Sequence, residues 1–279
     1  EQTVTTPTPE EARSQIVNLV RDFVRRDVEP VAAKLDKEDI VPHDLINKMK
    51  ELGLFGITVP EEYGGLGLDY TTYAMIVEEL CKGWMSVAGV INTHLIMSYL
   101  LFTFGTEEQK QRLLPALARG EKFGGLAQTE PDAGSDVQAI KTSAIKDGDN
   151  YIINGSKLFI TNGIRGTTFL LKAKTDPKAD PGRAGISAFI VEKGGHGFTT
   201  GRELDKLGYR SLDTGELIFQ DFRLLPRLTA QENVALPLEL LATSPAEAAV
   251  QAEALLATVG VADRLDHLPA KLSGGEQQR

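Results

Sequence analysis

DGDNYIINGSKLFITNG, residues 147–163, is the stretch that decides which architecture this chain is expected to adopt. It holds two dipeptides that favour tight turns, Asp147-Gly148 and Asn154-Gly155, between runs of residues with high strand propensity. Upstream of residue 120 apolar residues recur every three or four positions, whereas here they recur at a period of about two. The stretch therefore predicts strands joined by turns and marks a change from helical to strand structure.

Three further runs downstream have the composition of strands. They are TTFLLKAKT at 167–175, GISAFIVEK at 185–193 and TGELIFQDFRL at 214–224. Strands that recur about every ten residues without an intervening helix are typical of antiparallel barrels and sandwiches. We therefore expect residues 122–225 to form an antiparallel β-barrel as the middle domain.

The residues before this region follow a helical period. One apolar helix face is predicted, and Pro30 interrupts or kinks the run; the face comprises Ile16, Val17, Leu19, Val20, Phe23 and Val24. Further helices are expected over 44–52, stopped by Gly53, over 72–81, over 86–104, and after Thr106, where TEEQ has capping-box spacing. The glycine-rich segment 60–70 is expected to be a loop. Residues 1–121 thus predict an all-helical N-terminal domain.

Beyond Pro226 the composition becomes rich in alanine. SPAEAAVQAEALLATVG, residues 244–260, predicts a helix with Ser244 as N-cap, Pro245 at the first helical position and Gly260 after its end. Residues 226–279 are therefore expected to be a short helical C-terminal segment. The order of helices, strands and helices predicts an α+β fold.

The composition is that of a globular protein and excludes several classes of function. Of 279 residues, 42% are hydrophobic and 25% charged, and the formal net charge is −9, which disfavours nucleic acid as a partner. The single cysteine, Cys81, excludes an internal disulfide and a multi-cysteine metal site and fits a reducing, cytoplasmic compartment. Because the four histidines are scattered, no metal site is expected. The absence of a GK dipeptide excludes a Walker A loop.

The two ends and the most apolar stretch also carry information. The first fifteen residues are polar and acidic, so no signal peptide is expected. Residues 86–105 are the most apolar, but Asn92, His94 and other polar residues interrupt them, which predicts a buried core helix rather than a membrane span. The sequence lacks an initiator Met and stops at Arg279 inside an apparent motif, so a fragment is expected.

One stretch of the predicted middle domain has the composition of a phosphate-binding loop. LAQTEPDAGSDVQAIKT, residues 126–142, contains DAGSD, a small-residue turn whose amides and Ser135 hydroxyl can approach a phosphate without steric conflict. Taken alone, an ordinary turn is the simpler interpretation.

Several motifs together resemble the acyl-CoA dehydrogenase family. They are residues 126–142 and 151–163, together with FGITVPEEYGGLGLDY at 55–70, FGTEEQKQRLLPALARGE at 104–121 and KLGYRSLDTGELIF at 206–219, in the family's order. The resemblance covers about residues 8–222. It implies a flavoprotein oxidoreductase of fatty acid metabolism that binds FAD and removes hydrogens from the α and β carbons of an acyl-CoA thioester.

The resemblance also implies which residues contact cofactor and substrate. Thr129 would hydrogen-bond the isoalloxazine ring, Phe159 would lie against one face of it, and the Thr161 hydroxyl would lie near N5. Ser135 would approach both the pyrophosphate and the CoA moiety, and Thr175 corresponds to a substrate-contacting serine. The full set of implied flavin contacts is Leu126, Ala127, Gln128, Thr129, Gly134, Ser135, Phe159, Ile160 and Thr161. For Phe159 the alternative is an ordinary core residue of a strand.

In the family a carboxylate removes the α-proton while the β-hydrogen leaves as hydride to flavin N5. That base is a glutamate of a C-terminal helical domain, and no stretch of this sequence resembles it, so no catalytic residue is assigned. We therefore expect the chain alone to be inactive. The resemblance further implies an electron-transfer flavoprotein or another acceptor. A homo-oligomer is compatible with it, although the usual C-terminal interface is missing.

The tail resembles a different family. Residues 219–279 are similar to the helical subdomain of an ABC transporter ATPase, from Q-loop to signature motif. Gln220 would be the Q-loop glutamine, and the signature LSGGEQ would place Ser273, Gly274, Gly275 and Glu276 at a nucleotide held by another subunit. An interaction module and a chimeric reading frame without evolved function are the alternatives.

Overall fold

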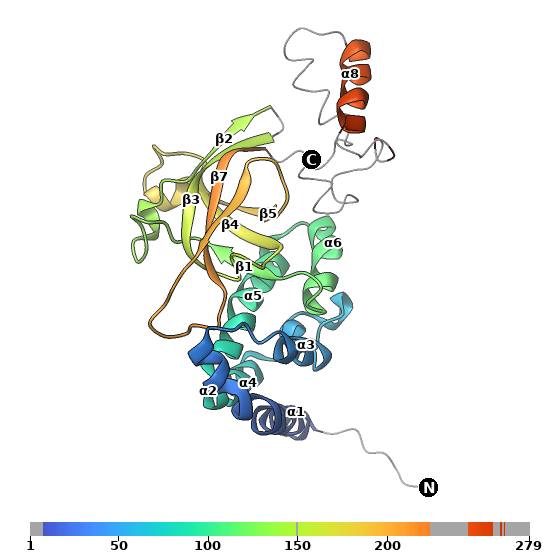
Figure 1. Cartoon of the computed structure of the whole chain (residues 1–279), viewed down its shortest axis with the longest axis vertical. Helices are drawn as coiled ribbons and strands as arrows, with labels where there is room; N and C mark the ends of the chain where they lie inside the picture. The colour runs from blue at the N-terminus through green and yellow to red at the C-terminus, as the bar shows by residue number, and fades with distance from the viewer. Residues whose placement is uncertain (1–7, 149, 224–244, 259–262, 264, 266–279) are drawn as a thin grey trace.

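The computed structural model describes residues 8–148, 150–223, 245–258, 263 and 265 (Figure 1). The first part is helical. Its α-helices are α1 (Pro9–Phe23), α2 (Glu29–Glu38), α3 (His43–Glu51), α4 (Tyr70–Gly83), α5 (Met85–Phe104) and α6 (Glu107–Ala118), and short 3₁₀ turns occupy Leu54–Gly56 and Glu61–Tyr63. The predicted helices are confirmed, with ends that differ by up to two residues.

Local sequence signals fix several of these helix ends. The predicted capping box at Thr106 is present, because its hydroxyl accepts the Gln109 N–H while the Gln109 side chain accepts the Thr106 N–H. Thr8 and Glu11 form the same motif at α1. Gly53 follows α3 in the left-handed region, as expected of a residue that ends a helix.

Pro30 does not break the first helical run. The chain continues from α1 through a π-helical segment, Val24–Val28, into α2, which carries Pro30 in its first turn. Proline lacks an N–H and is tolerated at a helix start, and the wider π turn before it absorbs the change of hydrogen-bond pattern. The predicted apolar face is wrong at Leu19, which is 52% exposed.

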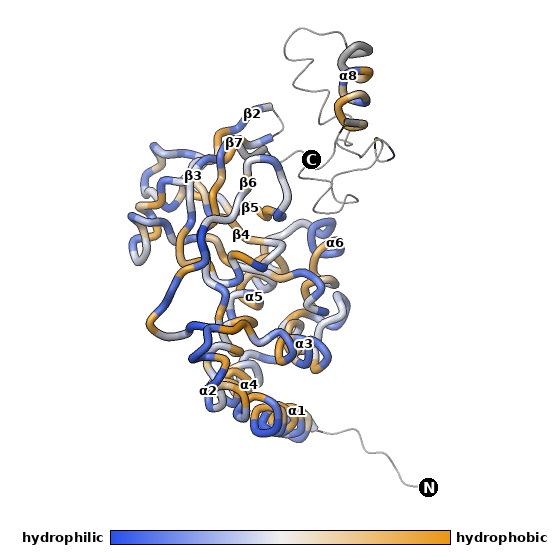
Figure 2. Tube along the Cα trace, viewed as in Figure 1, coloured by the Kyte–Doolittle hydropathy of each residue, from blue (hydrophilic) through white to orange (hydrophobic). Residues whose placement is uncertain are grey.

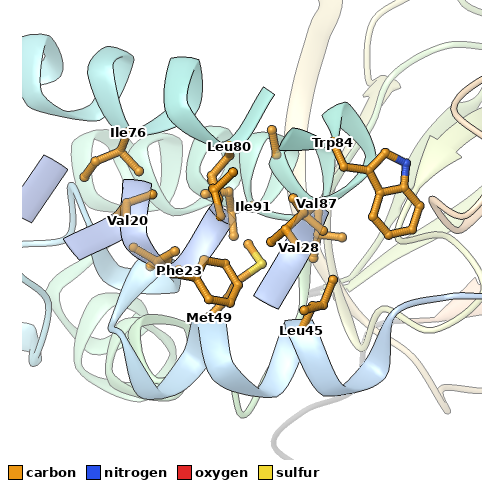
Figure 3. Close-up of a cluster of buried hydrophobic side chains, with 14 of the residues drawn as sticks. Val20, Phe23, Val28, Leu45, Met49, Ile76, Leu80, Trp84, Val87 and Ile91 are labelled. Atoms are coloured by element: carbon orange, nitrogen blue, oxygen red, sulfur yellow. The ribbon is translucent and has the colours of Figure 1, made fainter. Parts of the chain in front are cut away.

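The helices share one core, and Figure 3 shows its centre, in which side chains of α1, α3, α4 and α5 converge. The core includes Val20, Phe23, Val28, Leu45, Met49, Ile76, Leu80, Trp84, Val87 and Ile91. Among the described residues α5 is the one helix with the length and hydropathy of a membrane span, yet 56% of its apolar window is buried. Because α5 also packs against α4, α6 and the sheet, the predicted core helix is confirmed.

The second part is a sheet of seven strands. They are β1 (Gly124–Ala127), β2 (Ser143–Asp147), β3 (Asn150–Thr161), β4 (Thr168–Lys174), β5 (Ile186–Glu192), β6 (Phe198–Glu203) and β7 (Thr214–Arg223), in the order β1-β4-β2-β3-β7-β6 with β5 beside β4. Figure 2 shows hydrophobic residues interspersed with hydrophilic ones along these strands. The alternation matches a sheet whose buried side chains form their own core cluster.

The expected antiparallel sheet is wrong, because the observed sheet is mixed. β4 pairs antiparallel with β5 but parallel with β1, and it also meets β2 in parallel. β1 is a four-residue strand, GGLA, without alternation, and its partner β4 lies beyond the β2–β3 hairpin. Sequence spacing carries no signal for such a nonlocal parallel pair.

The two predicted turns have different outcomes. Asp147-Gly148 is confirmed, since β2 and β3 are antiparallel and Asp147 pairs with Asn150 across the connection. Asn154-Gly155 lies inside β3, where the register with β7 shifts. Gly155 has φ +148°, and a Cβ there would lie 2.4 Å from Thr142 Oγ1. This glycine therefore permits close strand approach in a bulge rather than a turn.

Helix α8 (Pro245–Thr258) confirms the predicted C-terminal helix and its start at Pro245. The expected caps Ser244 and Gly260 lie outside the described residues.

Candidate functional site

The loop after β1 runs along β3 and brings most of the predicted flavin contacts to one region. Leu158 donates its N–H to Thr129 O at 2.9 Å. Leu126 of β1, just before this loop, donates its N–H to Thr93 Oγ1 of α5 at 3.2 Å. The loop is therefore held between the sheet and the central helix, with Thr129 next to the strand segment that carries Phe159 and Thr161.

Phe159 has an unusual conformation for a bulky residue. Its φ is +59°, its side chain is 63% exposed, and it lies at the register shift of β3 between Lys157 and Ile160. A non-glycine residue in this region costs about 1–3 kcal/mol, and such strain clusters at functional sites. Phe159 is therefore not an ordinary core residue, and its ring is presented to solvent.

Three predicted hydroxyl groups lie on the same loop and strand. The side chains of Thr129 and Thr161 are half-buried, and Ser135 is exposed. Within the described residues none of these hydroxyls has a hydrogen-bond partner, so they are available to a ligand. An exposed aromatic ring and free hydroxyls on one strand and the loop bonded to it fit a flavin, whose ring is flat and whose edge and phosphates accept hydrogen bonds.

The loop beyond Thr129 is open at its tip. Glu130 and Ala133 bond each other across a tight turn, and Asp136 Oδ1 accepts the Gln138 N–H at 3.1 Å. Gly134, which follows this turn, is exposed, and a Cβ placed there would meet nothing within 4 Å. A large ligand group can therefore approach the backbone at this tip.

Two of the predicted flavin residues point their side chains elsewhere. Ala127 and Ile160 belong to the core of the sheet, and Ile160 is 2% exposed. Leu126 and Gln128 are half-buried. For Ala127 and Ile160 only the backbone remains to contact a cofactor, and the predicted contacts of all four residues stay predictions.

A buried ion pair lies behind this face, and sequence reasoning missed it. Lys157 Nζ is 2.7 Å from Glu130 Oε1 and donates to Gln128 O at 3.0 Å. Burial lowers the pKa of Lys157, against the attraction of Glu130. Burial also acts to raise the pKa of Glu130, but bonds from Lys157 and Thr142 outweigh it and leave that pKa lowered. The available signal was a lysine at an inward position of an alternating strand.

The remaining predicted site residues lie apart from this face. The Thr175 hydroxyl is 2.8 Å from Ser187 Oγ and bonds Gly185 O, so its substrate contact stays a prediction. Gln220 is an exposed residue of β7. The signature residues Ser273, Gly274, Gly275 and Glu276 lie outside the described residues.

Two cavities were found elsewhere. One of about 110 Å³ lies beside α3 and is lined by Lys50, Phe123 and Asn162, among others. A more open one of about 480 Å³ is lined by Trp84 and Tyr209, among others. Neither of these two cavities is lined by a predicted flavin residue. No group of three or more potential metal ligands was found in the part of the chain that the structure describes.

Two family models match the chain in the expected order. The model for the N-terminal domain of acyl-CoA dehydrogenase matches residues 10–121, and the model for its middle domain matches residues 125–222. The short-chain specific acyl-CoA dehydrogenase of Clostridium acetobutylicum is 40% identical over 239 residues, which are 85% of this chain and 62% of that protein.

Solved structures agree with this match. An acyl-CoA dehydrogenase from Geobacillus kaustophilus has a TM-score of 0.72 at 33% identity, covering 93% of this chain and 72% of that one. The electron transferring flavoprotein of Acidaminococcus fermentans has a TM-score of 0.73 at 40% identity, covering 80% and 58%. A glutaryl-CoA dehydrogenase from Mycobacterium smegmatis in complex with FADH2 has a TM-score of 0.71 at 30% identity, covering 78% and 57%. This chain thus spans less than two thirds of several relatives.

Proposed function

The chain belongs to the acyl-CoA dehydrogenase family, and on this premise we propose that it binds FAD on the face formed by Thr129, Ser135, Phe159 and Thr161. FAD is the cofactor of this family, and one structural neighbour carries its reduced form. The observation that carries the proposal is the strained backbone and exposed ring of Phe159, on a strand and adjoining loop whose hydroxyls have no hydrogen-bond partner within the described part of the chain. The proposed reaction is the α,β-dehydrogenation of an acyl-CoA thioester.

The residues of this face have distinct proposed roles. Phe159 would cover one face of the ring system, and the hydroxyls of Thr129 and Thr161 would fix its orientation by hydrogen bonds. Gly134 and Ser135 would accommodate the pyrophosphate at the open tip of the loop. When bound, the flavin supplies the hydride acceptor, while the protein supplies orientation and excludes water on this side.

We assign the general base to no residue of this sequence. Removal of an α-proton requires a carboxylate within hydrogen-bond reach of the substrate, and loss of such a base commonly slows a reaction roughly 10²–10⁴-fold. That a polypeptide of residues 1–279 turns over slowly by itself therefore stays a prediction.

The partners are also part of the proposal. An acyl-CoA thioester would be the substrate and an electron-transferring flavoprotein the acceptor, which the structural neighbour of that description supports. A homo-oligomer and a cytoplasmic location remain proposals from the sequence. The net charge of −9 supports the expectation that nucleic acid is not a partner.

A nucleotide-binding function of the tail receives no support. The family models end at residue 222, and none of the relatives reported above is a transporter ATPase. Most of residues 224–279 lies outside the described part. We therefore propose no ATPase function, and the chimera interpretation is likewise unsupported.

The experiment that tests the flavin site is a titration of the desalted polypeptide with FAD, followed by quenching of flavin fluorescence. Phe159→Ala should weaken binding by at least about ten-fold, because it removes the ring contact. The matched control is Phe104→Ala, since Phe104 is also exposed, at 78%, but lies at the end of α5. Equal affinity in both variants would show that the cofactor lies elsewhere.

A further inference from the structure

Lys157 is a charged residue in the middle of a strand, and its side chain is completely buried. The side chains of Lys157 and Glu130 are 0% and 5% exposed. Among the ion pairs of the described residues, no other has both side chains below one tenth exposed. Taking two charges out of water costs several kcal/mol for each ion, so such a pair persists only with good geometry and further hydrogen bonds. The stability of the fold alone does not require it, because an apolar pair of similar volume is often as stable.

The hydrogen bonds of this pair hold the residues on either side of Thr129. Lys157 binds the carbonyl of Gln128, the residue before Thr129, and the carboxylate of Glu130, the residue after it. The carbonyl of Thr129 itself accepts the N–H of Leu158, the neighbour of Lys157. Three consecutive loop residues are thus bonded to two consecutive residues of β3.

Glu130 extends the same arrangement to the far end of the loop. Its carboxylate accepts the backbone N–H groups of Lys141 at 2.5 Å and Thr142 at 3.0 Å. The carboxylate of Glu130, at the start of the loop that carries Gly134 and Ser135, is therefore hydrogen-bonded to the backbone at the end of that loop. Lys157 also lies two residues before Phe159, on the near side of the register shift that places Phe159 in its strained conformation.

We infer that Lys157 and Glu130 are positioning residues that set Thr129, the loop tip and Phe159 in the arrangement required to bind the flavin. The inference rests on the proposed flavin site. Without the ammonium group, Gln128 O and Glu130 lose their shared partner, and the bond from the Leu158 N–H to Thr129 O is left to hold this part of the loop to β3. Neither residue is among the proposed flavin contacts, so the pair would act through the residues that are.

The test compares two double variants of the 279-residue polypeptide. Lys157→Met with Glu130→Gln removes both charges, keeps the length of the side chain at 130 and shortens the one at 157 by a single atom. The control is Lys122→Met with Glu192→Gln, which removes the more exposed ion pair between the segment after α6 and β5, together with the pair of Glu192 and Arg112. We expect the first variant to remain folded by circular dichroism and to bind FAD at least about ten-fold more weakly. The shoulders on the visible absorption band of the bound flavin should also become less resolved. The control should bind FAD as the unmodified chain does.

Hydrogen exchange of the flavin-free chain provides a readout that does not depend on the cofactor. The amides of Leu158, Lys141 and Thr142 should exchange faster in the first variant and at unchanged rates in the control. If the first variant is folded and matches the unmodified chain in both FAD affinity and exchange, the inference is overturned. If it does not fold, Glu130→Gln alone removes the negative charge and keeps one of the two acceptor oxygens. Unchanged FAD affinity and exchange in that variant overturn the inference.

Failure of the proposed function gives a different result. If the unmodified chain binds no FAD, the flavin site is refuted, and the positioning of the loop is then decided by exchange alone. Faster exchange at the three amides in the first variant supports positioning, and equal exchange overturns it.

Discussion

His94 of α5 joins the helical part to the sheet through Gly124 of β1, because its Nδ1 accepts the Gly124 N–H at 2.9 Å. The other ring nitrogen, Nε2, lies 3.1 Å from Phe55 O and therefore carries the proton that it donates. The ring is fully buried, so it is held as one neutral tautomer with both nitrogens used. Burial lowers the pKa of His94 to about 4.

This arrangement predicts a loss of stability in mild acid. The folded-state pKa of about 4 lies below the ordinary value of 6.5, so the unfolded chain binds the proton more tightly. The contribution of His94 is therefore complete above pH 6.5 and is lost as the pH falls towards 4, by about 3 kcal/mol in total. Urea unfolding at intervals between pH 7 and pH 4 measures it.

The control for this prediction is a second histidine. His94→Gln should flatten the pH dependence over this range, although it also lowers the free energy of unfolding at pH 7. His43→Gln, at an exposed position, should leave the dependence as it is. A His94→Gln chain with the same slope as the unmodified chain would place the acid sensitivity elsewhere.

Gly155→Ala should destabilise the fold by about 2–3 kcal/mol, because the new Cβ combines a strained φ with a close approach to Thr142. Gly148→Ala is the matched variant. Gly148 also has a positive φ, +59°, but its Cβ would meet nothing within 4 Å, so only about 1 kcal/mol is expected. Thermal denaturation of both variants measures the difference, and equal losses would contradict the steric account of the bulge.

Asn162→Ala should cost about 2–4 kcal/mol. The Asn162 amide donates to Val90 O and Gly124 O, both at 3.1 Å, and its removal leaves two buried carbonyls between the sheet and α5 without that partner. Asn162 also has φ +60°, which glycine adopts without strain. Asn162→Gly should therefore be less harmful than Asn162→Ala, as measured by urea unfolding. The reverse order would mean that the backbone at this position is not strained.

The helical part could be predicted from sequence because its signals are local. A capping box at Thr106, a helix-ending Gly53 and apolar spacing each act within a few residues, and the structure confirms all three except for the apolar face at Leu19. The π-helical segment before Pro30 was not predicted, since the sequence shows only that proline disturbs a helix and not how the chain adapts.

The sheet and the site depend on nonlocal contacts, and sequence spacing reveals less of these. Asn154-Gly155 has the composition of a turn, but pairing of β3 with both β2 and β7 keeps it inside a strand. The mixed topology follows from β1, whose four residues carry no strand pattern. The family resemblance identified Phe159, but its exposure and strain became visible only in the structure. The Lys157–Glu130 pair was missed because it joins a strand to a loop 27 residues away.

Phe159→Gly should leave the flavin-free chain more stable than Phe159→Ala does, while both substitutions weaken flavin binding. Glycine adopts φ +59° without the steric cost borne by phenylalanine, so the free energy of unfolding should exceed that of Phe159→Ala by about 1 kcal/mol. Both variants lack the ring, so both should bind FAD at least about ten-fold more weakly than the unmodified chain. Their difference in urea unfolding isolates the backbone strain, and their shared loss of affinity isolates the ring. If the alanine variant proved the more stable, the left-handed conformation would carry no strain. If both kept full FAD affinity, the exposed ring would serve another ligand. Strain relieved together with binding lost would show that the fold maintains an unfavourable conformation at Phe159 because it holds the ring where the cofactor is bound.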